Sequence, residues 1–243
     1  MQKFFLPRDL IHGNQAVITG QDARHIVRVL RLNKGDALCL TDGRGTDLTG
    51  RIIDTAPDRV CLEIVHSQSS NSESPLPFTV CSGLLKHQKM DTVIKGLTQM
   101  GITRWIPFFC ERSIPVLDAK ALIRRMERWQ TIAKETIKQC RRSRLVEISS
   151  PKTFEEILTL APEFDHCIAF WEKASHPLSS LTPLEGANRT ILLIGPEGGF
   201  SEPEMAGASA AGFTPYTLGP RILRAETAAL CGAALIQHRL GDM

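Results

Sequence analysis

The sequence predicts an α/β protein of two domains, a small β-barrel followed by a mostly parallel sheet covered by helices. Three observations lead to this prediction: short β-type runs in the first quarter of the chain, a polar stretch at residues 66–77, and strand–helix alternation after it. The polar stretch contains five serines and two prolines, and it is predicted to be a linker because it cannot bury enough apolar surface to fold alone. We therefore expect one domain at residues 1–70 and the other at residues 71–243.

The first domain is predicted to be a barrel because its short apolar runs are separated by turns rich in Asn, Asp and Gly. The predicted strands are residues 16–18, 37–40, 50–53 and 60–65. One helix, at about residues 21–32, interrupts them. Its apolar residues follow helical spacing and predict a buried stripe of Ala23, Ile26, Val27 and Leu30. Three basic residues follow the same spacing on another face: Arg24, Arg28 and Arg31.

The second domain is predicted to contain a mostly parallel sheet because strand-like and helix-like segments alternate along it. The predicted strands are residues 78–85, 103–109, 167–170, 190–194 and 216–218. The predicted helices are residues 89–100, 118–140 and 225–239. The last helix has a face of small residues, which would let another helix of this chain or of a second subunit approach closely.

Charge and cysteine usage exclude several classes of protein. The formal net charge of +3 is too small to prove a nucleic-acid partner, so the placement of the basic residues matters more. The seven cysteines have no framework spacing, which fits a reducing compartment, and no His or Cys cluster has the spacing of metal ligands. Charge and proline interrupt the first nine residues before an apolar signal segment can form. We expect a soluble, cytoplasmic protein without a metal site.

The segment Ile194–Glu204, with the sequence IGPEGGFSEPE, predicts a ligand-binding loop between a buried strand and a helix. Glycines at 195, 198 and 199 allow the backbone to lie against a ligand, and Ser201 with Glu204 has the pattern of a capping box. The loop lacks both the dinucleotide fingerprint and the P-loop lysine, and Glu197 would repel a pyrophosphate. An uncharged or cationic adenosine ligand, such as S-adenosylmethionine, fits better. A tight turn that binds nothing is the alternative.

A second Gly-Pro turn follows about twenty residues later, in LGPRILRAETAAL at Leu218–Leu230. Two such loops can form two walls of one pocket. Arg224 stands at a predicted helix N-terminus, where the helix dipole disfavours a cation, so a functional role is expected for it. The alternative is that Arg224 pairs with Glu197 or Glu226 and only braces the loop.

Basic residues gather in three places, as phosphate binding requires. The predicted RNA contacts are Arg24, Arg28, Arg31, Lys86, Lys89, Lys138, Arg141, Arg142 and Arg144. The alternative for the run near Lys138 is a solvated helix end, since positive charge suits a helix C-terminus.

The two loop motifs together resemble the paired C-terminal motifs of the RsmE family of SPOUT RNA methyltransferases. KHQKMD at Lys86–Asp91, ERSIP at Glu111–Pro115 and the segment Arg128–Ile148 extend the resemblance over nearly the whole chain. The resemblance implies an N-terminal PUA-like barrel, a SPOUT-type trefoil-knotted domain and a homodimer. It also implies methylation of N3 of a uridine in the decoding region of 16S ribosomal RNA, with S-adenosylmethionine as cofactor.

Site residues follow from these motifs. The predicted cofactor contacts are Ile194, Gly195, Pro196, Glu197, Gly198, Gly199, Leu218, Gly219, Ile222, Leu223 and Arg224. Arg224 is expected to stabilise the developing uracil anion, and Glu197, Glu226 or a water to accept the proton. The chain departs from the family pattern at Gly96, Gln99 and Lys138, where acids are lost and positive charge is gained. Alternatives are a SPOUT methyltransferase of another ribosomal or transfer RNA site, or an RNA-binding assembly factor without catalysis.

Overall fold

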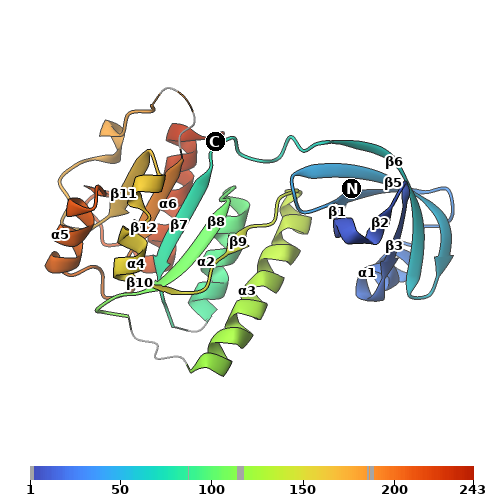
Figure 1. Cartoon of the computed structure of the whole chain (residues 1–243), viewed down its shortest axis with the longest axis horizontal. Coiled ribbons are helices and arrows are strands. Elements are labelled where there is room, and N and C mark those ends of the chain that lie inside the picture. The colour runs from blue at the N-terminus through green and yellow to red at the C-terminus, as the bar shows by residue number, and fades with distance from the viewer. Residues whose placement is uncertain (1–2, 87, 114–117, 185, 187–188) are drawn as a thin grey trace. The chain divides into compact units, whose positions relative to one another are not determined.

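The computed structural model describes residues 3–86, 88–113, 118–184, 186 and 189–243 (Figure 1). The chain forms two compact units. The first comprises Met1–Glu73 together with Lys134–Leu145, and the second comprises Ser74–Ala133 with Val146–Met243. The C-terminal part of one long helix therefore belongs to the first unit, a feature that the sequence did not indicate.

The first unit contains a six-stranded sheet with the strand order β1-β4-β5-β6-β3-β2. Its strands are β1 (Lys3–Phe5), β2 (Ile11–His12), β3 (Gln15–Thr19), β4 (Ala37–Thr41), β5 (Thr46–Ala56) and β6 (Arg59–Ser69). All neighbours pair antiparallel except β1 with β4. The four predicted strands are confirmed, whereas β1 and β2 were not predicted. The linker prediction is wrong over residues 66–69, because β6 continues there in register with the long strand β5.

The predicted helix of the first unit is shorter than expected. Helix α1 (Gly20–Arg24) passes directly into one π-helical turn, η2 (His25–Val29). Ala23 and Ile26 are fully buried in the barrel core, but Leu30 is 37% exposed, so the predicted apolar stripe ends early. Arg31 adopts a left-handed backbone with φ of 55°, which takes the chain out of the helix.

Residues 134–145 are held in the first unit by buried polar contacts. The Thr41 Oγ1 hydroxyl donates to the Ser143 carbonyl at 2.9 Å, and Lys3 Nζ donates to the Arg141 carbonyl at 2.6 Å. Arg142 is 3% exposed and pairs with Glu73 at 2.8 Å, and Lys138 is 7% exposed.

The prediction that Lys138 and Arg142 contact RNA is therefore wrong for both residues. Lys138 Nζ lies 3.0 Å from Asp22 and 2.9 Å from Glu135. Both cations are buried and paired with acids of their own unit, so neither presents its charge to a phosphate.

The second unit contains seven strands, all in parallel pairs, in the order β10-β8-β7-β12-β11-β13 with β9 beside β8. The strands are β7 (Phe78–Gly83), β8 (Arg104–Phe109), β9 (Glu147–Ile148), β10 (Lys152–Thr153), β11 (His166–Phe170), β12 (Thr190–Ile194) and β13 (Thr214–Tyr216). The helices are α2 (Gln88–Gln99), α3 (Ala119–Cys140), α4 (Phe154–Leu158), α5 (Glu202–Ala210) and α6 (Ala225–Leu240). Among the described residues, no helix is both long enough and apolar enough to span a bilayer.

Helices cover both faces of this sheet (Figure 1). Leu192 and Ile194 of β12 join the core formed with α2, α3 and α6, whereas Ile191 and Leu193 join the core formed with α4 and α5. A strand buried on both faces is apolar at every position, which explains the unbroken run in the sequence. Strands β11 and β12 end side by side, with Phe170 opposite Ile194.

The small face of α6 packs inside the unit. A Cβ at Gly232 would lie 2.5 Å from the buried ring of Phe170. We expect Gly232→Ala to lower the free energy of unfolding by up to about 2 kcal/mol, because overpacking costs about 1–3 kcal/mol against a helix-propensity gain of about 1 kcal/mol. Gly207→Ala in α5 is the control, since its Cβ would meet only Leu158, at 3.7 Å, and it should be stabilising. Urea unfolding of both variants checks this, and equal stabilisation would contradict it.

Candidate active site

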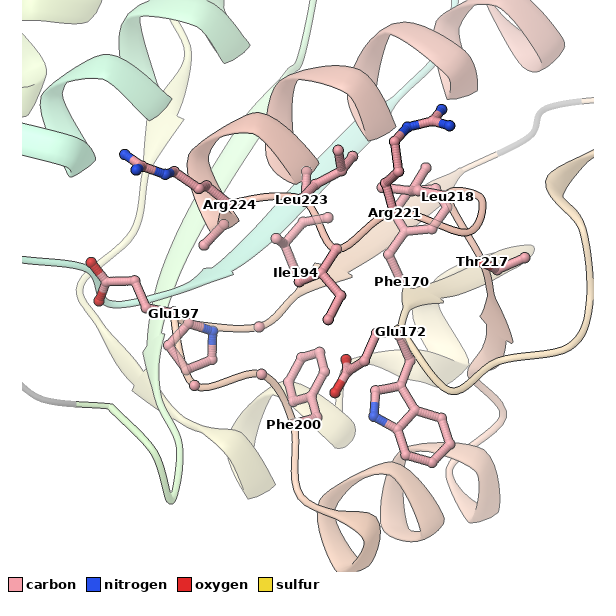
Figure 2. Close-up of a pocket in the computed structure, with 18 of the residues that line it drawn as sticks. Phe170, Glu172, Ile194, Glu197, Phe200, Thr217, Leu218, Arg221, Leu223 and Arg224 are labelled. Carbon is pink, nitrogen blue, oxygen red and sulfur yellow. The ribbon is translucent and has the colours of Figure 1, made fainter.

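One cavity of about 550 Å³ lies beyond the carboxyl ends of β11 and β12 (Figure 2). All of the residues predicted to contact the cofactor line it, from both glycine loops. The prediction that the two loops wall one pocket is therefore confirmed. Parallel strands end at the same edge of a sheet, which is where open α/β folds bind ligands.

The first loop is shaped by close backbone approaches. A Cβ at Gly83, the last residue of β7, would lie 2.6 Å from the Pro196 nitrogen, so the loop passes directly over the end of that strand. Gly199 has φ of +67° and its N–H donates to the Pro196 carbonyl at 2.9 Å, closing a tight turn. The capping box predicted at Ser201 and Glu204 is confirmed, and it starts α5 at Glu202.

The segment after β8 braces this loop from outside. Arg112 donates to the Gly198 carbonyl at 2.9 Å, and the Glu111 N–H donates to Glu204 at 2.8 Å. These contacts explain two residues of the ERSIP motif. Residues 114 and 115 of that motif, and residue 87 of KHQKMD, lie outside the described residues.

The second loop joins β13 to α6. Strand β13 ends at Tyr216, two residues earlier than predicted, and Gly219 has φ of +100°. Ile222 is 87% exposed although it lines the pocket. Arg224 is the N-cap residue of α6 and makes no side-chain cap, as expected for a cation at that position.

Several lining residues were not predicted from the sequence. They are Lys89, Phe170, Trp171, Glu172, Phe200, Thr217, Arg221, Ala225 and Ala228. Trp171 and Glu172 directly follow β11, the strand beside β12, so the rule that ligands bind at carboxyl strand ends could have found them.

The polar and charged side chains of the pocket lie on two sides of it. Figure 2 shows Glu197 and Arg224 on one side, and Glu172 with Thr217 on the other. A Cβ at Gly199 would lie 3.3 Å from a Glu172 carboxylate oxygen, so that carboxylate lies against the glycine loop. The Trp171 Nε1 is buried and has no hydrogen-bond partner among the described residues.

Lys89, predicted to contact RNA, lies beside the two carboxylates among the catalytic candidates. Its Nζ is 2.7 Å from a Glu197 oxygen and 3.7 Å from Oε2 of Glu226. The hydrogen bond that Lys89 donates to Glu197, together with the charges of both carboxylates, raises the pKa of Lys89 above its ordinary value.

Arg224 has no comparable contact. Its side chain forms no hydrogen bond or ion pair with any residue that the structure describes, so the alternative in which Arg224 pairs with Glu197 or Glu226 is wrong. Lys89 makes those pairs in its place.

The remaining predicted RNA contacts are at the surface. Arg24, Arg28, Arg31, Arg141 and Arg144 are exposed on the first unit, and Lys86 is exposed on the second. Their contact with phosphate stays a prediction.

Comparison with known proteins gives the family. The family model described as an RNA methyltransferase domain matches residues 72–237, and one described as an RNA methyltransferase PUA domain matches residues 18–65. A ribosomal RNA small subunit methyltransferase E from Synechocystis is 32% identical over 96% of this chain and 76% of its own length. The chain belongs to the RsmE family.

Further relatives and solved structures are similar to this chain over nearly its whole length. The Bacillus subtilis enzyme of the same name is 29% identical over 98% of this chain and 97% of its own length. A crystal structure of the Neisseria gonorrhoeae enzyme, bound to S-adenosylmethionine, has a TM-score of 0.89 and 29% identity and covers 100% of this chain and 99% of its own. A putative methyltransferase from Legionella pneumophila, in complex with the same cofactor, also has a TM-score of 0.89, at 26% identity, with 100% and 99% covered. The predicted fold class, a SPOUT-type α/β domain with a PUA-like N-terminal domain, is confirmed.

Proposed function

We propose that this chain transfers the methyl group of S-adenosylmethionine to N3 of a uridine in the decoding region of 16S ribosomal RNA. The observation that supports this most directly is the pocket that the two glycine loops form together, with an unpaired arginine at its edge. RsmE relatives named for the ribosomal small subunit, and two relatives crystallised with this cofactor, support the substrate and the methyl donor.

The pocket fits the cofactor in size and in charge. A volume of about 550 Å³ is within the usual range for ligand sites. Gly195 and Gly199 bring main chain to its wall, and a Cβ at Gly195 would lie 3.3 Å from Phe200 and the Gly199 backbone. On its side of the pocket Glu172 favours a ligand that carries positive charge there, and Trp171 Nε1 offers an unused donor. When bound, S-adenosylmethionine supplies an electrophilic methyl group on a sulfonium centre.

The opposite side of the pocket supplies the groups that act on the base. Uridine N3 carries a proton and is a weak nucleophile until that proton leaves. Arg224 can stabilise the charge that develops on the uracil carbonyl oxygens, but it cannot act as the base, because guanidinium stays protonated. The acceptor of the proton in this proposal is Glu197 or Glu226, which both lie near Lys89, or a water.

The experiment is calorimetric titration with S-adenosylmethionine, followed by methyl transfer to small subunits that lack the modification. Methyl on N3 blocks base pairing, so a reverse-transcriptase stop locates the modified nucleotide. A stop at another nucleotide, or methylation of transfer RNA, would support a SPOUT enzyme of different target. An assembly factor without catalysis predicts no cofactor binding.

RNA contact by the first unit gives a separate test. We expect Arg24→Glu and Arg28→Glu each to weaken ribosomal RNA binding and to reduce the slope of log K against log salt, because each removes an exposed cation from the α1 region. Filter binding between 50 and 200 mM salt, a range over which phosphate contacts weaken by about 10³–10⁵-fold in large interfaces, measures this.

Lys152→Glu is the matched control for these variants, since Lys152 makes a long pair with Glu156 at 3.8 Å in the other unit. Unchanged affinity in both Arg variants would remove the α1 region from the RNA contact. An equal loss in the Lys152 variant would show a general effect of net charge.

A further inference from the structure

Helix α2 places one cation between two carboxylates, one from a loop and one from another helix. Lys89 lies in the first turn of α2, Glu197 lies in the loop after β12, and Glu226 lies in the first turn of α6. Lys89 donates a hydrogen bond to Glu197 at 2.7 Å and lies 3.7 Å from Oε2 of Glu226, beyond hydrogen-bonding distance. Arg224, two residues before Glu226, is another charged group that acts on Lys89.

The two carboxylates differ in how they are held. Oε1 of Glu197 accepts a hydrogen bond from the Lys89 ammonium group, which anchors that carboxylate. Oε2 of Glu226 is buried and has no hydrogen-bond partner among the described residues, and its side chain is 18% exposed. A buried carboxylate oxygen without a donor is costly, so one that persists at a pocket is a candidate for a functional role.

Two nearby groups nevertheless stabilise negative charge on Glu226. The Lys89 ammonium attracts it at 3.7 Å, and the N-terminus of α6 favours an acid in its first turn. Neither group donates a hydrogen bond to Oε2 within the part of the chain that the structure describes. Arg224 and Ala225, the two residues before Glu226, line the pocket, so this oxygen lies next to residues of the pocket wall.

We infer that Lys89 is a positioning residue for methyl transfer, which holds the carboxylates of Glu197 and Glu226 in place so that Oε2 of Glu226 takes the proton of the nitrogen being methylated. This inference rests on the proposed function. The N–H bond breaks, the proton passes to Oε2, and the electron pair left on nitrogen forms the new bond to the methyl carbon. The electron pair of the broken methyl–sulfur bond stays on sulfur.

The test compares Lys89→Met, Lys89→Arg and Lys95→Met. Lys95 is exposed on the same helix, away from the carboxylates. Lys95→Met therefore removes the same charge from α2 and serves as the control. For each variant, kcat and KM are measured across pH, and RNA binding is measured across salt concentration. Melting temperatures establish that all three variants fold.

We expect Lys89→Met to lower kcat at least about tenfold, towards the 10²–10⁴-fold that loss of the proton acceptor itself would cost. Without the cation, neither carboxylate is held in place for proton transfer, so kcat should fall while the KM for RNA stays close to the wild-type value. RNA affinity and its salt slope should not change. Lys89→Arg should restore most of kcat, and Glu226→Gln should be more impaired than Glu197→Gln.

A different pattern would overturn the inference. If Lys89 contacts an RNA phosphate, Lys89→Met will weaken RNA binding and lower the salt slope by about one, with kcat at saturating RNA unchanged. Full kcat in Glu226→Gln would also overturn it, as would equal losses in Lys89→Met and Lys95→Met. A wild-type protein that binds cofactor but transfers no methyl group refutes the proposed function itself, which is a distinct result.

Discussion

Arg224→Ala is expected to lower kcat for methyl transfer by about 10²–10³-fold, the usual cost of removing one donor that stabilises developing charge. The side chain has no partner among the described residues, so its truncation leaves no buried group unpaired. The substitution also removes a cation from a helix N-terminus, so the free energy of unfolding should stay within about 0.5 kcal/mol of the wild-type value. Single-turnover methyl transfer at saturating RNA measures the change.

Cofactor binding separates the roles that Arg224 could have. Figure 2 shows its side chain on the side of Glu197, away from Glu172, so we expect the dissociation constant for S-adenosylmethionine to change little. Arg224→Lys keeps the charge without the forked donor and should be intermediate in kcat. Full activity of Arg224→Ala would remove the residue from the mechanism, and loss of calorimetric binding would assign it to the cofactor.

Much of the fold could be predicted because burial on both faces leaves a clear pattern. The unbroken apolar run of β12 and the capping box at Ser201 are local signals, and both were interpreted correctly. Strands β9 and β10 have two residues each, too few for any periodicity, and were not predicted. The chain leaves η2 early because Arg31 has a left-handed backbone conformation. This conformation could not be predicted, because it is uncommon for residues other than glycine.

In the candidate site too, the features with a local sequence signal were predicted and the contacts between distant residues were not. Glycine turns after apolar strands predicted both walls of the pocket, because glycine lets the main chain lie against a ligand where parallel strands end. The pairing of Lys89 with Glu197, 108 residues away, could not be predicted, because a run of basic residues carries no information on distant acids. The assignment of Lys138 to RNA was wrong for this reason, since its partner Asp22 is 116 residues away.

A second large effect, on stability, is expected from substitution of Arg142, whose partner Glu73 lies 69 residues earlier in the chain. Their side chains are 3% and 13% exposed and are joined by hydrogen bonds of 2.8 and 3.1 Å. Arg142→Ala should lower the free energy of unfolding by about 3–5 kcal/mol, because it leaves a buried charge without its cation. Glu73 also accepts from the backbone N–H groups of Ser143 and Arg144, so the loss should fall near the lower end of that range.

A double-mutant cycle distinguishes this pair from ordinary packing. Arg144→Ala is the surface control, since its side chain is exposed, and it should change stability by less than about 0.5 kcal/mol. In Glu73→Gln the amide oxygen can still accept from the Ser143 and Arg144 N–H groups, but the NH₂ group cannot accept from Arg142 and no charge is left unpaired. Arg142→Ala should therefore cost less in that background than in the wild type. Equal costs in both backgrounds would show that the arginine acts through its apolar stem alone. A large coupling energy would show instead that this ion pair holds residues 134–145 in the first unit, which explains why two basic residues of that segment are unavailable to RNA.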